Sequence, residues 1–330
     1  MGVNRYKGLD SLKALCAFMV VCIHVPFVFG PGKYYLDITR FAVPCFFMIS
    51  GFFYPNTMKK AGEIKQIIRI AKLTLVSFAL FLVWTRLFYF WTGQDFGYVV
   101  DRLTSFNGLV KLIVFNNAFV AYHLWYLFAF LYVLIVALIA CKLKLKKLLW
   151  IASPLLLLAG IVLGNYSGPV LGGSVTGDLA RNCWFFGLPF FCTGWIISEN
   201  REKICAKLNR GSLLIVIVLS LAAQFAEHFL LERAGHAVYG DIYLSTLFYA
   251  VSVFLYFLMY VKGEGLFALI GRKYSTGIYL IHPAIIDIVG HFVSKTSFVD
   301  AYFRVSPLVI FLLSLLVVAS WKKLAERKAR

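Results

Sequence analysis

Long apolar stretches recur from one end of this chain to the other, and each is close to the roughly 20 residues that a helix needs to cross a bilayer. Hydrophobic residues make up 61% of the 330 positions and charged residues only 15%, whereas soluble domains have about 45–50% and about 25%. The pattern predicts an all-α, polytopic membrane protein. About ten transmembrane helices are expected, at 9–29, 36–56, 67–91, 122–141, 147–165, 182–199, 211–230, 242–262, 274–293 and 305–324.

Basic residues gather in alternate loops between these stretches. One set of loops and the two termini hold 22 of the 33 Lys and Arg residues, in groups at 5–7, 59–69, 142–147, 201–210, 262–273 and 322–330. Cytoplasmic loops carry such an excess, so both termini are predicted in the cytoplasm and the protein in the cell inner membrane. The net charge of +18 is explained by topology and contact with the lipid bilayer, and no nucleic-acid partner is predicted.

The loops leave no block long enough for a soluble domain, so we expect residues 1–330 to form a single membrane domain with no appended soluble domain. The seven cysteines show no CxxC spacing and no extracytoplasmic pair, so neither a disulfide framework nor a metal site is predicted. The longest outward loop, 92–121, has enough apolar character near its centre for an interfacial helix.

His24 lies deep in the first apolar segment, where a titratable side chain is expensive and usually faces a cavity or a partner. Lys13 precedes it by eleven residues, about three turns and ~16 Å along the same helical face. Asp10, one turn before Lys13, is a candidate ion-pair partner for it. A structural hydrogen bond for His24 and a snorkelling role for Lys13 are the alternatives to a lined pathway.

Arg40 enters the second segment from the outer side, to a depth similar to that of His24. Asp37, one turn earlier, is the nearest acceptor for it. Pro44 frees a carbonyl and permits a kink, and Ser50 adds a further polar group to the same helix. The sequence leaves open a structural Arg–Asp pair and a clamp for an anion or oxyanion.

Two more segments place polar groups at the membrane. The string HLWYL begins the fourth span, with His123 and Tyr126 on one side and Trp125 where an aromatic belt is expected. The ninth span reads YSTGIYLIHP, and spacings of four and three residues place its polar side chains on one stripe. That stripe consists of Ser275, Tyr279 and His282.

Taken together and in this order, Lys13 followed by ten residues and His24, then RFAVPCFFMISGFF, HLWYL and YSTGIYLIHP, closely resemble the acyltransferase-3 family of integral membrane acyltransferases. The resemblance covers residues 5 to about 320. It implies ten helices with cytoplasmic ends. It also implies transfer of an acyl group, commonly acetyl, from cytoplasmic acyl-CoA to a sugar or related acceptor.

The resemblance also implies roles for particular residues. His24 would act as general base and Arg40 would stabilise the thioester oxygen. Cations near the cytoplasmic side would hold the CoA phosphates, namely Lys13, Arg69, Lys72, Arg272 and Lys273. The remaining polar residues of the spans line the pathway or the acceptor side. Acyl-CoA is a co-substrate, and no permanently bound cofactor is expected.

The chain departs from the family in two respects. An Arg-x-x-Arg motif is replaced by Arg69-x-x-Lys72, which keeps the charge but loses bidentate geometry. Some relatives carry a secreted esterase-like domain or a cytoplasmic amino-acid racemase domain, and neither is expected here. The acceptor is then an envelope glycan, a lipid-linked sugar or another hydroxyl compound, reached directly or through a separate extracytoplasmic transferase partner. The alternative function is a proton-coupled transporter of a small anionic or zwitterionic solute.

Overall fold

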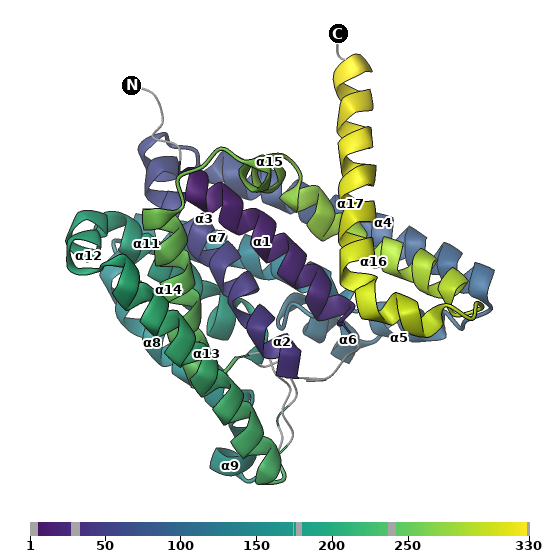
Figure 1. Ribbon diagram of the computed structural model, residues 1–330, viewed down its shortest axis with the longest axis horizontal. Coiled ribbons are helices and arrows are strands. Elements are labelled where there is room, and N and C mark those ends of the chain that lie inside the picture. Colours follow the sequence, from purple (N-terminus) through teal and green to yellow (C-terminus); the bar gives the residue numbers. More distant parts are fainter. Residues whose placement is uncertain (1–5, 28–33, 174, 176–179, 237–241, 329–330) are drawn as a thin grey trace. The chain divides into compact units, whose positions relative to one another are not determined.

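The computed structural model describes residues 6–27, 34–173, 175, 180–236 and 242–328, and these residues form helices and no strands (Figure 1). Contacts divide the chain into two compact units. Unit 1 comprises Met1–Phe46, Lys207–Ala226 and Ser245–Arg330, and unit 2 comprises Phe47–Ala206 and Glu227–Leu244. Both units are therefore discontinuous in sequence.

Each of the ten predicted spans is helical over most of its described length. Among the described residues, seven helical segments are long and apolar enough to cross a membrane: Tyr35–Lys59, Glu63–Thr92, Tyr122–Lys142, Lys146–Leu163, Arg210–Arg233, Ser275–Val293 and Val299–Arg327. Of the other three, α1 (Lys7–His24) carries three charged side chains. The remaining two are shorter: α11 (Leu188–Glu199) has 12 residues and α14 (Leu244–Tyr260) has 17. The count of ten spans and the cytoplasmic placement of the termini stay predictions.

Unit 1 is built around α1. Besides α14, its helices are α2 (Tyr35–Ile38), η2 (Thr39–Phe41), the start of α3 (Ala42–Lys59), most of α13 (Arg210–Arg233), α15 (Leu266–Lys273), α16 (Ser275–Val293) and α17 (Val299–Lys328). Small and branched side chains of α1 pack against isoleucines of α15, α16 and α17, in a core of Ala14, Ala17, Val21, Val25, Ile270, Ile278, Ile285 and Ile310. These small side chains let the neighbouring helices approach α1 closely (Figure 1).

Unit 2 contains the rest of α3 and the last residues of α13. Its other elements are α4 (Glu63–Thr92), α5 (Gly97–Thr104), α6 (Phe106–Ile113), η3 (Tyr122–Leu124), α7 (Trp125–Lys142), α8 (Lys146–Leu163), α9 (Ser167–Leu171), the π-helical turn η4 (Cys183–Gly187), α11 and α12 (Arg201–Lys207). Helix α4 packs against α7, and α8 packs against η4 and α11. Aromatic side chains fill much of this packing, and Tyr54 lies edge-on to Trp195 at 4.9 Å between ring centroids.

Helix α4 shows why this chain belongs in a bilayer. Large apolar side chains along it stay exposed, and Leu75, Leu80 and Leu87 are each at least 60% accessible. Soluble proteins rarely expose apolar surface in such continuous stripes, whereas lipid tails cover it without cost. With 30 residues, α4 is ~45 Å long at 1.5 Å per residue and exceeds the ~30 Å hydrocarbon core.

The loops follow local chemistry. The 92–121 segment contains two short helices, α5 and α6, and their position at the membrane interface stays a prediction. Ser105 caps α6 by accepting a hydrogen bond from the Gly108 N–H at 3.2 Å. Beyond α8, Tyr166 donates its hydroxyl proton to Glu227. Burial, and next the Glu227 carboxylate, raise the pKa of the Tyr166 hydroxyl well above its ordinary value. Tyr166 therefore stays protonated and able to donate at any physiological pH.

Candidate functional site

His24 is the last residue of α1. The helix was expected to continue to residue 29 but ends here, because Val25 precedes Pro26 and a residue before proline avoids helical backbone angles. Val25 accordingly has φ −137° and ψ 86°, although its N–H still closes the last turn on the Val21 carbonyl. The imidazole therefore sits at an open helix end, where it is exposed.

A second imidazole lies beside the first. The rings of His24 and His282 are 5.1 Å apart between centroids and tilted by 45°. His282 comes from α16 and is fully buried. Its Nδ1 lies 3.1 Å from the Ile278 carbonyl oxygen. Because a carbonyl oxygen can only accept a hydrogen bond, Nδ1 carries the proton and donates, and in a neutral His282 the Nε2 atom is an acceptor. The structure thus brings together two residues that the sequence singled out separately.

The polar stripe predicted on α16 is present and buried. Ser275, Tyr279 and His282 all face the interior of unit 1, and the Tyr279 ring lies 6.4 Å from that of His282. The Ser275 hydroxyl donates to the Gly271 carbonyl at 2.6 Å, a local bond typical of serine in a helix. The Ser275 hydroxyl group therefore stabilises the junction between the end of α15 and the start of α16.

Basic residues gather where α15 crosses α1. Lys13 and Asp10 form the expected ion pair, with Nζ 3.2 Å from Oδ1. Gly271 touches this turn so closely that a Cβ there would overlap the Asp10 carbonyl oxygen. The next two residues of α15 are Arg272 and Lys273, both exposed. Three of the five cations predicted to hold the acyl donor are therefore neighbours in unit 1.

One further cation belongs to this group. Lys322 of α17 donates to the backbone carbonyl of Lys273 and lies 5.5 Å from the centre of the Tyr274 ring. Its sequence context, a basic run after an apolar span, indicated only topology. The contact with α15 arises from the tertiary packing.

The segment that carries Arg40 is fixed by buried hydrogen bonds. The Gln224 amide donates to the Asp37 carbonyl at 2.5 Å and accepts from the Thr246 hydroxyl at 2.7 Å. Asp37 and Gln224 are fully buried, and Arg40 is half-buried in η2. Gln224 was missed in the sequence, although a lone amide in an apolar helix is a signal of an internal partner.

Pro44, which was predicted to permit a kink, is the third residue of α3. It lies in the first turn of α3, directly after η2. The first residues of a helix have no intrahelical acceptor for their N–H groups, so a proline there removes no hydrogen bond.

The other predicted site residues lie in unit 2. His123 is buried, with its ring 4.9 Å from that of Phe81. Trp125 and Tyr126 pack against Phe47 with centroids 6.5 Å and 4.8 Å away, so both take part in the aromatic core of the unit. The rest are Ser50, half-buried on α3, and the exposed Arg69 and Lys72 on α4.

Comparison with known proteins gives relatives for almost the whole chain. A serine/alanine racemase of Enterococcus gallinarum is 25% identical over 94% of this chain and 45% of its own length. An amino-acid racemase of Enterococcus faecalis is 26% identical over 88% of this chain and 42% of its own length. The chain thus spans less than half of these curated relatives, whose names describe the whole proteins. No solved structure matches the chain significantly.

The family comparison is more specific. Residues 6–321 match the family model described as an acyltransferase domain, Acyl_transf_3. This match covers nearly the whole chain and confirms the resemblance that its motifs carry. The chain therefore belongs to the acyltransferase-3 family.

Proposed function

We propose that the protein transfers an acyl group, in the first place acetyl, from cytoplasmic acyl-CoA to a hydroxyl group of a cell-envelope glycan, within the inner membrane. Family membership supports an acyltransferase in a membrane. The single observation that carries the mechanism is the pair of adjacent imidazoles, His24 and His282, at the end of α1.

His24 acts as the general base in this proposal. Its neutral ring takes the proton of the acceptor hydroxyl, and the oxygen attacks the thioester carbonyl carbon. The carbon–sulfur bond of the tetrahedral intermediate then breaks, and the thiolate of CoA leaves with the proton held by the imidazolium. The products are an ester and free CoA, and His24 is neutral again.

His282 is a positioning residue. Its Nδ1–H is committed to the Ile278 carbonyl, so its Nε2 presents a lone pair on the side away from that carbonyl. The two rings are 5.1 Å apart, so two imidazolium cations at this distance would repel each other. The pair therefore takes up a single proton during each catalytic turnover.

Donor binding is assigned to the basic group at the α1–α15 contact. The Arg272 guanidinium can bind phosphate oxygens with two parallel hydrogen bonds, and the ammonium groups of Lys13 and Lys273 add two compact positive charges. Arg69 and Lys72 of unit 2 are also assigned to donor binding, but only because of the family motif. Arg40, held by the hydrogen bonds around Gln224, stabilises the negative oxygen of the intermediate.

One observation favours a second candidate, a carrier of zwitterionic solutes. The two relatives are named for enzymes that act on amino acids, and a pair of adjacent imidazoles in membrane helices also suits proton-coupled transport. The test is uptake of labelled serine or alanine by proteoliposomes without any acyl donor. Uptake that is lost with His24→Ala would establish the carrier function and contradict the transferase function.

The decisive test of the transferase is His24→Ala. Removal of a general base lowers the rate by about 10²–10⁴-fold, so acylation of surface glycans, measured by mass spectrometry, should fall to background. His291→Ala is the matched control. His291 lies in the last turn of α16, the helix that also carries His282, and contacts Lys295, but it has no part in the proposed reaction. Unchanged acylation by folded, inserted His24→Ala protein would rule out the assignment.

A further inference from the structure

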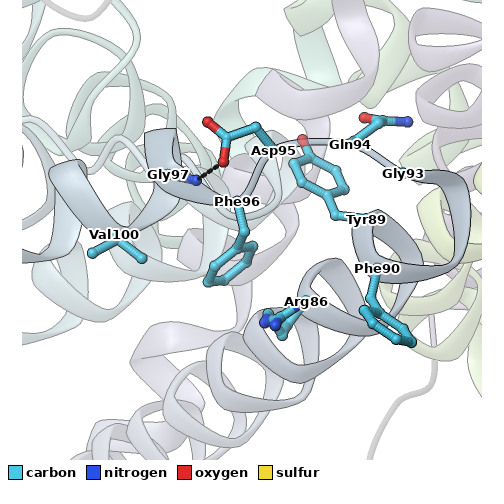
Figure 2. A pocket seen from close by; sticks show the side chains of 9 residues that line it. All are labelled: Arg86, Tyr89, Phe90, Gly93, Gln94, Asp95, Phe96, Gly97 and Val100. Atoms are coloured by element: carbon cyan, nitrogen blue, oxygen red, sulfur yellow. Dashed lines mark hydrogen bonds between the residues drawn. The ribbon is translucent and has the colours of Figure 1, made fainter.

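An open pocket of about 510 Å³ lies at the C-terminal end of α4, within unit 2 (Figure 2). This volume is in the range of small-ligand sites, about 300–1,000 Å³. Its principal side chains are Arg86, Tyr89, Phe90, Gln94, Asp95 and Phe96. The pocket shares no residue with the His24 site.

Three aromatic rings and one guanidinium form its walls. The Arg86 guanidinium carbon lies 5.8 Å from the centre of the Phe90 ring and 5.6 Å from that of Phe96. Figure 2 shows the Arg86 side chain between these two rings. Tyr89 meets Phe96 edge-on at 6.2 Å. The cation–π contacts hold the guanidinium in place, while its N–H groups remain able to donate to a ligand.

The polar side chains balance in charge. Asp95 accepts a hydrogen bond at 2.8 Å from the N–H of Gly97, two residues further along the chain. This bond fixes the carboxylate and leaves it further lone pairs for a ligand. Gln94 adds one acceptor and two donors. One positive and one negative side chain give the pocket no net charge. This composition suits a neutral ligand with many hydroxyl groups better than a phosphate or another strong anion.

The local backbone shapes the pocket. Gly93 ends α4 with φ +73°, the left-handed region that a residue with a Cβ adopts at a cost. This turn folds the Gln94–Phe96 segment back beside the last turns of α4. The residues that line the pocket thus come from a helix and from the loop that follows it.

The pocket also lies at the outer end of α4. Basic residues mark the other end of the helix, which the charge pattern predicts to be cytoplasmic. Arg69 and Arg86 are 17 residues apart in one continuous helix, or ~26 Å at 1.5 Å per residue. A ligand of this pocket therefore comes from outside the cytoplasm.

We propose that this pocket binds a neutral sugar unit of an extracytoplasmic glycan. The weakly positive C–H face of a sugar ring packs against the negative faces of Tyr89 and Phe96. The sugar hydroxyls accept from Arg86 and donate to Asp95. An open pocket admits one unit of a longer chain. The proposal rests on the proposed function for the class of ligand, but sugar binding needs no acyl donor.

The test is a binding measurement on the full-length protein in lipid nanodiscs, without acyl donor. A glycan array of neutral and anionic oligosaccharides identifies a neutral ligand, and calorimetry then gives its Kd. Asp95→Asn can still accept the hydrogen bond from the Gly97 N–H but removes the negative charge, and Arg86→Ala removes the guanidinium N–H donors. Each should weaken binding about tenfold or more, the usual effect of losing a hydrogen bond to a charged group.

Arg102→Ala is the matched control, since Arg102 makes the same kind of contact, 5.1 Å from the Tyr98 ring, outside the pocket. Its Kd should stay at the wild-type value. Three results would overturn the sugar site: no saturable binding of any neutral oligosaccharide, equal Kd values in all three variants, or binding confined to inorganic phosphate, glycerol phosphate or anionic lipid. Loss of acylation with intact sugar binding would instead count against the transferase alone.

Discussion

At the scale of single residues, the position of His24 at a helix end has an energetic consequence. The last turn of a helix leaves carbonyl groups without intrahelical partners, and their partial negative charge favours a nearby cation. A general base becomes a cation when it takes its proton. In the proposed reaction, the break at Pro26 places His24 where its charged form is stabilised, with the His282 ring 5.1 Å away.

Substitution of His282 by phenylalanine tests this division of roles. His282→Phe keeps an aromatic ring of similar shape beside His24 but removes both nitrogens. We expect kcat to fall about tenfold, which corresponds to about 1.4 kcal/mol of transition-state stabilisation, with an unchanged KM for the acyl donor. The pH–rate profile should also change, because a coupled pair becomes a single titrating group. A lower kcat with an unaltered profile would indicate a purely structural His282.

At the scale of helices, the α1–α15 contact determines whether the basic group exists. Gly8 brings α1 close to α14, and Gly271 brings α15 close to α1. A Cβ on Gly8 would overlap the Phe257 carbonyl of α14, and one on Gly271 would overlap the Asp10 carbonyl of α1. Because both obstacles are backbone atoms within helices, they cannot move aside as a flexible side chain would.

Gly271→Ala should therefore separate α15 from α1. Overpacking of this kind costs about 1–3 kcal/mol, so the midpoint of thermal unfolding in detergent should fall and the KM for acyl-CoA should rise as Arg272 and Lys273 move away from Lys13. Gly290→Ala on α16 is the control, because no atom lies within 4 Å of its Cβ position and alanine favours a helix over glycine. Equal stability and equal KM for the two variants would contradict the packing argument.

At the scale of the whole molecule, the distribution of charge decides orientation. Unit 2 offers a clear case, because α4 carries basic residues at its start and the neutral pocket near its end, and its 30 residues are enough to cross a bilayer. The predicted inner-membrane location and the direction of transfer both depend on this asymmetry.

Cysteine labelling checks the orientation. In a variant without the seven native cysteines, Gln94→Cys should react with a membrane-impermeant maleimide in intact cells. Lys60→Cys, just before α4, should react only after the membrane is opened. The reverse pattern of labelling would invert the topology and, with it, the side of the membrane from which the pocket binds its ligand.

Part of the site could be predicted because ionisable groups are rare in apolar helices. His24, Arg40 and the stripe of α16 stand out for this reason, and the Asp10–Lys13 pair follows from one helical turn. Gln224, Lys322 and the Arg86 pocket could not be predicted in the same way. Their significance depends on partners 22 to 187 residues away in the chain, or on a turn whose shape the composition does not specify.

An all-helical membrane protein of the acyltransferase-3 family could be predicted from the sequence, because apolar length and motif order are properties of consecutive residues. Only the tertiary structure decided that two imidazoles share one place, that α15 brings cations to the start of α1, and that the end of α4 forms a pocket. These features depend on how closely separate helices approach one another. That distance is set by the fit of side chains across the contact, which no single segment of the chain contains.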